Sequence, residues 1–263
     1  MSILDRILEG RRRAVRTLRS KTPPSTLEAS ALWGEPRRPF ADLLRRATRG
    51  DAVRFLAEIK RASPSAGPIR PGADVAAIAR EYEEAGAAAL SVLTEPEFFD
   101  GDPAFLAVAR TATRLPVLMK DFVVDEWQIP WARSLGADAV LLIVAVCDRV
   151  QLRDLAAAAR EVGVASLVEI HGEGELDRAL EIGADMIGVN HRDLSTLEVD
   201  LGLSERLLPR IPAGIVRIAE SGIRSREDAV RLEGIGFDAL LVGEHLMRAA
   251  SPGAALRALR GIA

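Results

Sequence analysis

The sequence is almost free of cysteine and has no long hydrophobic run. Cys147 is the single cysteine among 263 residues, which excludes an internal disulfide and fits a reducing compartment. The longest apolar stretch, residues 139–147, is far shorter than the roughly 20 residues of a membrane-spanning helix. The opening residues, MSILDRILEGRRRAV, lack the continuous apolar segment of a secretion signal. We therefore expect a cytoplasmic protein without a membrane partner.

An excess of charge of one sign and a cluster of metal ligands are also missing. The chain has 35 basic and 38 acidic residues, a net charge of -3, so no basic surplus indicates a nucleic-acid partner. His171, His191 and His245 are isolated in the sequence, which is more typical of loop or surface histidines than of metal ligands. We expect no metal and no nucleic acid.

Residues 1–20 predict an amphipathic helix with a basic face. Isoleucine and leucine recur there at helical spacing, and we assign the arginines to the polar positions. Such a helix could bind a membrane, an anionic partner or a second subunit, but a charged face in water on a helix packed against its own domain is commoner, and we expect that arrangement. The arginines are Arg6, Arg11, Arg12, Arg13, Arg16 and Arg19.

Two further features delimit an N-terminal extension. TPPST, at residues 22–26, ends the first helix because consecutive prolines cannot continue it. A second short helix is expected at residues 40–48. Residues 1–48 are therefore predicted to form a helical extension of the main domain.

From residue 54 onward, short apolar stretches alternate with helical ones. This alternation predicts a parallel sheet, because parallel neighbours need a crossover connection. The predicted strands cover residues 54–59, 88–93, 116–119, 138–143, 165–170, 186–190, 215–220 and 238–242.

A repeat ahead of every second strand indicates that the sheet is closed. EAGAAAL, SLGADAV, EIGADMI and GIGFDAL carry glycines 50, 47 and 53 residues apart, where a glycine can end a helix in the left-handed conformation. In a (β/α)8 barrel alternate strands fill alternate interior layers, whereas an open sheet gives no reason for this period. We predict an α/β fold, a (β/α)8 TIM barrel with an N-terminal helical extension, as one domain over residues 1–263. The glycines are Gly86, Gly136, Gly183 and Gly236.

Charged residues end several of the apolar strands. In FLAEIKRASPS, Glu58 and Lys60 are two residues apart, so they face the same side of the strand. The outer side lies under helices, where charge is costly, whereas the inner side opens at the barrel mouth, where active sites of this fold lie. Any one such residue also fits an ion pair that closes the barrel or an ordinary loop start. Together they predict a polar ring for proton transfer, whose other members are Lys120, Glu169, Asn190, Glu220 and, just beyond a strand, Arg192.

The last two strands are followed by a pattern typical of phosphate binding. AESGIRS places Ser221 and Gly222 after the seventh strand, and LVGEHLM places Gly243 and Glu244 after the eighth, at the start of a short helix. Backbone N–H groups at these two turns form the usual phosphate site of this fold. Two ordinary tight turns are the alternative.

Seven strand-end motifs follow one another along the chain: EIKRASPSAG, SVLTEPEFFDG, LMKDFVVDEWQI, LVEIH, NHRDLSTLEVD, IAESGI and LVGEHLM. They resemble, in order, those of the indole-3-glycerol-phosphate synthases. The resemblance covers the chain from about residue 40 to its end, and the N-terminal helices fit that family's extension. It implies a carbon–carbon lyase of tryptophan biosynthesis that needs no metal and no organic cofactor and binds a phosphorylated small molecule; we expect a monomer or a weak homodimer.

The resemblance also implies the reaction and a role for each matching residue. The substrate would be 1-(2-carboxyphenylamino)-1-deoxyribulose 5-phosphate, which closes to indole-3-glycerol phosphate with loss of carbon dioxide and water. Lys120 would be the general acid at the ketone, Lys60 would hold the carboxylate and donate a proton, and Glu169 would move protons in dehydration; the order in which the lysines act stays open. Glu58 would support the lysines, and Asn190 and Glu220 would bind the substrate hydroxyls. Phe99 and Phe122 would contact the aromatic ring, or they would be ordinary core residues. Ser63 and Arg192 would bind anionic groups, and the phosphate would bind at Ser221, Gly222, Gly243 and the backbone of Glu244.

Two other functions fit a phosphate-binding barrel. One is the isomerase that makes this substrate, but it uses a different acid/base pair, so two lysines at the rim argue against it. The other is an inactive barrel that binds a phosphorylated metabolite or a protein, which has no positive support because every expected acid and base is present.

Overall fold

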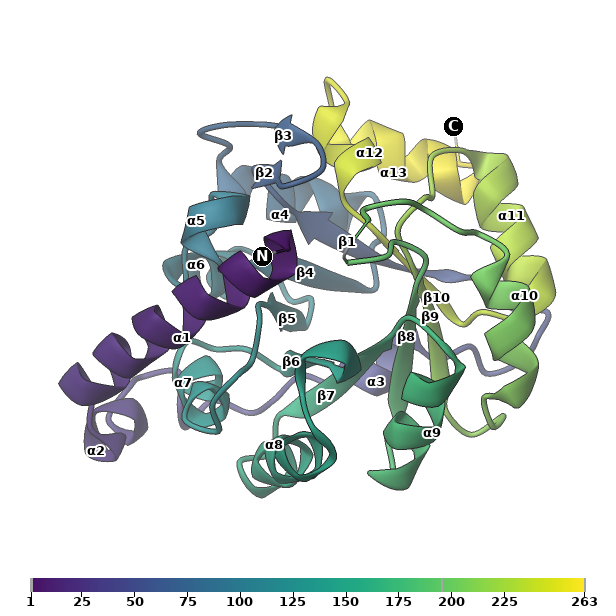
Figure 1. Cartoon of the computed structure of the whole chain (residues 1–263). Coiled ribbons are helices and arrows are strands. Elements are labelled where there is room, and N and C mark those ends of the chain that lie inside the picture. Colours follow the sequence, from purple (N-terminus) through teal and green to yellow (C-terminus); the bar gives the residue numbers. More distant parts are fainter. Residues whose placement is uncertain (1, 195, 263) are drawn as a thin grey trace.

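Eight parallel strands close into a barrel in the computed structural model, which describes residues 2–194 and 196–262 and so leaves Ser195 of the NHRDLSTLEVD motif undescribed. The strand order is β1-β10-β9-β8-β7-β6-β5-β4, and β1 pairs with β4 to complete the ring (Figure 1). All the predicted strands are present, and the predicted TIM barrel is confirmed. Their bounds are β1 Arg54–Ile59, β4 Ala89–Leu93, β5 Val117–Lys120, β6 Ala139–Ile143, β7 Ala165–Ile170, β8 Met186–Asn190, β9 Val216–Glu220 and β10 Ala239–Val242.

Helices surround the barrel because each crossover between parallel strands packs its apolar stripe on the outer face of the sheet. Capping side chains fix where several of them begin: Asp74, Asp148 and Ser225 each accept a hydrogen bond from a first-turn backbone N–H group. The helices are α4 Val75–Glu84, α5 Pro96–Phe99, α6 Ala104–Ala112, α7 Gln128–Ser134, α8 Arg149–Glu161, α9 Glu173–Glu181, α10 Leu203–Leu207, α11 Arg226–Ile235, α12 Glu244–Arg248 and α13 Pro252–Arg260, with short 3-10 turns at Val144–Val146 and Leu208–Arg210.

The glycine repeat has the conformation that the sequence predicts. All four glycines follow the ends of α4, α7, α9 and α11 with positive φ, at 81°, 91°, 68° and 112° for Gly86, Gly136, Gly183 and Gly236. A residue with a Cβ is strained in this conformation, so glycine is favoured there. Each of these turns leads directly into the next strand.

The N-terminal extension consists of α1 Ile3–Lys21, α2 Pro24–Glu28 and α3 Phe40–Leu44. α1 ends before the two prolines, as expected, but Pro24 begins α2, since proline is tolerated in a first helical turn. The helix expected over residues 40–48 ends at Leu44, because the chain then becomes extended and the Arg46 guanidinium binds the Phe237 carbonyl oxygen, 3.0 Å away. Figure 1 shows α1 crossing the face of the barrel beside its opening.

One arginine of α1 is not on the polar face to which we assigned it. Arg11 is only 3% exposed and forms an ion pair with Asp121 at 2.7 Å. It lies four residues after Ile7 and four before Val15, so helical spacing places it on the buried stripe. The helix is therefore tied to the end of β5 by a buried charge pair.

Two smaller features complete the fold. Ala62–Ser63 (β2) and Gly67–Pro68 (β3) pair as an antiparallel hairpin after β1, within the segment expected only as a loop. Within the described part of the chain, every helix is too short or too polar to cross a bilayer.

Candidate active site

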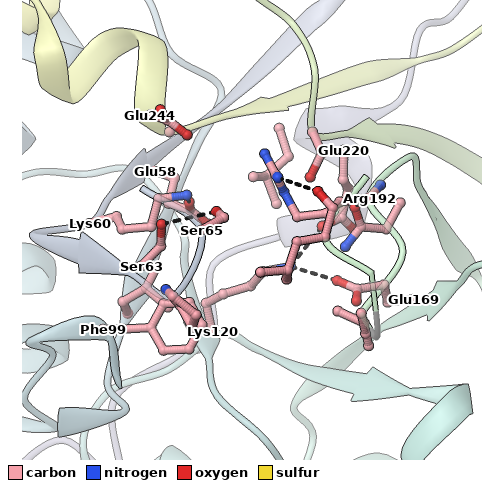
Figure 2. Close-up of a pocket in the computed structure, with 18 of the residues that line it drawn as sticks. Glu58, Lys60, Ser63, Ser65, Phe99, Lys120, Glu169, Arg192, Glu220 and Glu244 are labelled. Carbon is pink, nitrogen blue, oxygen red and sulfur yellow. Dashed lines mark hydrogen bonds and ion pairs between the residues drawn. The ribbon is translucent and has the colours of Figure 1, made fainter. Parts of the chain in front are cut away.

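A cavity of about 500 Å³ opens where the barrel strands end. The register places the ends of neighbouring strands level with one another: Leu93 pairs with Lys120, and Asn190 with Glu220. Ile3, Leu4 and Ile7 of α1 form part of its wall. Every site residue predicted from the sequence lines this one cavity: Glu58, Lys60, Ser63, Phe99, Lys120, Phe122, Glu169, Asn190, Arg192, Glu220, Ser221, Gly222, Gly243 and Glu244 (Figure 2).

Lys120 lies between two buried carboxylates in this cavity. Its Nζ donates hydrogen bonds of 2.7 Å to Oε2 of Glu169 and 2.7 Å to Oε2 of Glu220 (Figure 2). Burial lowers the pKa of Lys120, but the charges of Glu169 and Glu220 outweigh burial and raise that pKa well above the ordinary lysine value. The lysine is therefore a cation at neutral pH.

The two carboxylates beside Lys120 differ in their ionisation. Burial raises the pKa of Glu169, but the Lys120 cation and His171 outweigh it, so that pKa lies below the ordinary value. Burial also raises the pKa of Glu220, to about 8, because Lys120 only partly offsets burial and the Glu169 charge adds to it. At neutral pH one carboxylate can therefore accept a proton while the other holds one.

Glu220 also carries an unsatisfied oxygen. Its Oε1 is buried and has no hydrogen-bond partner among the described residues. Gly188 of β8 provides the space, because a Cβ at that position would lie 2.0 Å from this oxygen. A buried polar atom without a partner is costly, and because Glu220 lines the cavity, a bound ligand could complete the hydrogen bonding of this oxygen.

The pair Glu58 and Lys60 lies on another part of the cavity wall (Figure 2). Lys60 Nζ is 2.7 Å from Glu58 Oε1, and the Ser91 hydroxyl donates to Glu58 Oε2 at 3.2 Å. A Cβ at Gly243 would lie 2.3 Å from Glu58 Oε1, so glycine there makes room for the carboxylate. Both charges face inward, as their spacing in the strand predicts.

Aromatic and polar groups complete the lining. The rings of Phe99 and Phe122 are 6.1 Å apart between centroids and tilted by 43°. The Asn190 side-chain oxygen accepts a hydrogen bond of 3.1 Å from the Arg192 backbone N–H, and the Arg192 guanidinium donates to the Leu197 carbonyl oxygen at 2.8 Å. The cavity thus has an apolar region for a flat ring and a cation held at its rim.

The turns after β9 and β10 have the shape of an anion site. Ser221 and Gly222 both have positive φ, 69° and 80°, in a tight turn after Glu220. Gly243 precedes α12, whose first backbone N–H groups have no partner within the helix. The Glu244 carboxylate pairs with Arg248 at 3.0 Å, which leaves the backbone of Glu244 as the part suited to an anion.

Three groups next to the site were not predicted. Asp121, directly after Lys120, accepts hydrogen bonds from the Thr94 hydroxyl and from Arg11, 110 residues away. His171 lies within 3.3 Å of Glu169. His191, expected at the surface or in a loop, is 2% exposed; its ring contacts the Ser221 carbonyl oxygen at 3.0 Å and the Ser204 hydroxyl. Each of the three directly follows a strand, which is the signal in the sequence that could have placed it near the site. An isolated histidine in a sequence does not show which groups its ring will contact.

No group of three or more histidine, cysteine, aspartate or glutamate side chains within residues 2–194 and 196–262 is arranged to hold a metal ion. The side chains that converge here are lysines and carboxylates in direct contact, an arrangement suited to proton transfer.

The comparisons with known proteins agree with this chemistry. The chain matches the family model of indole-3-glycerol phosphate synthase over residues 4–259. It is 52% identical to indole-3-glycerol phosphate synthase 2 of Streptomyces coelicolor over 96% of this chain and 94% of that protein, and 47% identical to indole-3-glycerol phosphate synthase of Laribacter hongkongensis over 97% of each. The solved 3-hexulose-6-phosphate synthase from Salmonella typhimurium is similar over 80% of this chain and 97% of that one, with a TM-score of 0.62 and 15% identity, a likeness of fold alone. The chain belongs to the indole-3-glycerol phosphate synthase family.

Proposed function

We propose that this enzyme converts 1-(2-carboxyphenylamino)-1-deoxyribulose 5-phosphate to indole-3-glycerol phosphate, carbon dioxide and water, in tryptophan biosynthesis. The observation that carries the assignment of roles is Lys120, a cation held by two buried carboxylates in a cavity with an aromatic wall and two anion-binding turns. Family membership supports the reaction, and the geometry supports the roles below.

Ring closure needs an acid at the ketone. Lys120 donates a proton to the ketone oxygen while the carboxyl-bearing ring carbon attacks the carbonyl carbon. Its raised pKa keeps Lys120 protonated at neutral pH before the step. Lys60 binds the substrate carboxylate, and Glu58, 2.7 Å from Lys60, orients that cation. Loss of carbon dioxide then restores the aromatic ring.

Dehydration needs an acid and a base together. The new hydroxyl leaves as water with a proton from a lysine, either Lys60 or a Lys120 that has been protonated again. Glu169 takes the proton from the carbon next to the nitrogen; its lowered pKa means that it is ionised and able to accept. Glu220, with its free Oε1, and Asn190 hydrogen-bond the substrate hydroxyls.

The remaining lining residues bind the two ends of the substrate. Phe99 and Phe122 contact the aromatic ring, and Ser63 and Arg192 contact anionic groups. The phosphate binds at the turns formed by Ser221, Gly222 and Gly243 and at the backbone N–H of Glu244, whose carboxylate is engaged with Arg248.

The chain acts as a single domain over residues 1–263, in the cytoplasm, as a monomer or a weak homodimer. The single domain is supported by α1, which contributes to the cavity wall and is tied to Asp121 through Arg11. The reaction proceeds without metal and without an organic cofactor, because lysines and carboxylates supply each proton transfer it needs.

The test is an assay of the purified chain with the synthetic substrate, with indole fluorescence as the signal for product. We expect product to form at the same rate with and without a metal chelator. Absence of product would overturn the assignment, and loss of activity in chelator would overturn the metal-free mechanism. Production of the substrate from its phosphoribosyl isomer would instead favour the isomerase.

A further inference from the structure

Two residues behind Glu169 play no part in the mechanism above. His171 follows β7 and is not among the residues that line the cavity. Its Nε2 is 3.3 Å from Oε1 of Glu169, on the opposite carboxylate oxygen from Lys120, and its Nδ1 is 3.3 Å from Oε2 of Glu175 in α9. The same Glu175 oxygen accepts a hydrogen bond of 2.7 Å from the His171 backbone N–H. The imidazole ring is therefore held between two carboxylates.

These groups form a continuous row from the cavity to solvent. Lys120 bridges Glu220 and Glu169, Glu169 contacts His171, and His171 contacts Glu175. Side-chain exposure rises outward along the row, from 2% for Glu169 to 11% for His171 and 24% for Glu175. Each member can carry a proton; Glu175 reaches water at the outer end, and Lys120, 14% exposed, faces the cavity that the substrate fills at the inner end.

The reaction itself requires a proton from outside. The ketone oxygen takes up one proton when the ring closes and a second when it leaves as water. The carbon next to the nitrogen returns one proton, and the departing carboxylate leaves as carbon dioxide without taking or giving any. One proton per turnover must therefore come from solvent, while the substrate occupies the cavity side of Lys120.

We propose that Glu175 and His171 form the route by which this proton reaches Glu169 and Lys120. This inference rests on the proposed function. The imidazolium of His171 gives its Nε2 proton to Oε1 of Glu169, and Glu169 passes it on to Lys120. The neutral ring then flips, and its free nitrogen takes a replacement proton from Glu175, which takes one from solvent, so the relay ends each turnover unchanged. His171 is thus a positioning residue of the acid–base system and does not touch the substrate.

The electrostatics of the row are consistent with a proton resident on the ring. Burial lowers the pKa of His171, but hydrogen bonds to Glu169 and Glu175 and their charges outweigh burial and raise it to about 10. The charged groups facing the ring are Glu169 from β7 and Glu175 from α9. Arg178, the next charge along this side of α9, is bound to the Cys147 carbonyl oxygen. Nε2 is buried, and within the described chain its 3.3 Å contact with Oε1 of Glu169 is not an aligned hydrogen bond, so a small rotation of the ring must align the two atoms before the proton transfers.

The test is chemical rescue of His171→Ala. We expect its kcat to fall about tenfold, with KM little changed, because proton supply and not substrate binding is lost. Added imidazole should restore the rate in a saturable way, whereas wild type should not respond. The first turnover of the variant should be faster than later ones, because the site starts with its protons in place. Glu175→Gln should show a smaller decrease, and Glu173→Gln, in the same turn of α9 but paired with Arg210, should match wild type.

Two results would overturn the relay. Wild-type rates for His171→Ala in every buffer would mean that the proton enters elsewhere. Equal slowing of first and later turnovers without imidazole rescue would mean that His171 only holds Glu169 in place. Both results require active wild-type enzyme, so they differ from failure of the proposed function, in which wild type itself yields no product.

Discussion

Buried basic side chains meet carboxylates at both ends of the barrel, but the two sites are built differently. At the end where strands begin, Arg110 pairs with Asp138 at 2.7 Å, with side chains 5% and 0% exposed. At the end where strands finish, Lys120 pairs with Glu169 and Glu220, also at 2.7 Å each. The distances match, so distance alone does not separate a structural pair from a functional one.

The Asp138 site is complete. One carboxylate oxygen accepts hydrogen bonds from the Arg110 guanidinium at 2.7 Å and the Arg38 backbone N–H at 2.8 Å, and the other accepts from the Val117 backbone N–H at 2.9 Å. Arg110 also donates to the carbonyl oxygens of Gly136 and Pro36. These bonds join the N-terminal extension, α6 and the start of β5, so the pair acts as a structural joint.

The Lys120 site is incomplete by comparison. One cation faces two carboxylates, one oxygen of Glu220 has no partner in the part of the chain that the structure describes, and the cluster borders an open cavity. An incomplete buried network is unfavourable for stability, and it leaves protons and hydrogen-bonding capacity available to a substrate. The difference teaches that a buried ion pair points to function when it borders a cavity and keeps an oxygen available there, as Glu220 does, and not by its distance.

The largest expected effect separates the two ends by activity. Lys120→Met should lower kcat about 10²–10⁴-fold, because the acid at the ketone is lost, and should also lower the unfolding temperature at neutral pH, because Glu169 is left buried without its counter-charge. The control is Lys21→Met at the exposed end of α1, one of the three lysines in the chain. Steady-state assays and thermal unfolding measure both; near-normal turnover would remove Lys120 from its role.

The second prediction concerns stability, at the end of the barrel where the strands begin. Asp138→Asn should lower the free energy of unfolding by about 3–5 kcal/mol, because Arg110 is left buried without its counter-charge. Turnover per folded molecule should change little. Denaturant unfolding provides the measurement, with Glu181→Gln, which removes an exposed pair with Arg149, expected to cost less than about 1 kcal/mol. Equal effects of the two changes would contradict the structural assignment.

The third prediction compares Glu220 and Glu169 through the pH dependence of the free energy of unfolding. Glu220 has its pKa raised from 4.5 to about 8, so the folded state holds this proton more tightly than the unfolded chain, and stability from it is lost as pH rises from about 4.5 to 8. Glu220→Gln should flatten that decline in unfolding free energy. Glu169 has a lowered pKa, so Glu169→Gln should alter only the acid side, where stability is lost as pH falls. Identical slopes for wild type and Glu220→Gln would refute the assigned proton.

The smallest effect is expected at the phosphate turn. Glu244→Ser should change KM less than about fivefold, because the exposed pair with Arg248 is worth under about 1 kcal/mol and only the backbone faces the phosphate. Initial rates over a substrate series measure it. A large fall in KM would show that the carboxylate itself opposes phosphate binding.

The sequence predicts much of this arrangement because its signals are local. Strand alternation and the glycine repeat predict the barrel, and a charge two residues from another at a strand end predicts which side it faces. The convergence of Glu58, Lys120 and Glu169 then follows from closure of the barrel, since parallel strands all end at one rim.

The contacts that sequence reasoning missed depend on packing between distant segments. Arg11 pairs with Asp121 across 110 positions, and neither residue has a local pattern that names the other. His171 is a local exception: it contacts Glu169, two residues before it, and Glu175, four residues after it, but the sequence does not show which way the imidazole ring points. The aspartates of the repeat, such as Asp138, were visible in the sequence, but their bonds to the neighbouring strand were not.

The most direct test of the account is the structure of Lys120→Met with the carboxyphenylamino substrate bound. The account predicts intact substrate with its ketone oxygen facing position 120, its ring against Phe99 and Phe122, and its phosphate at Ser221, Gly222 and Gly243. Product in the cavity, or a substrate whose ketone lies away from position 120 and from Glu169, would contradict it.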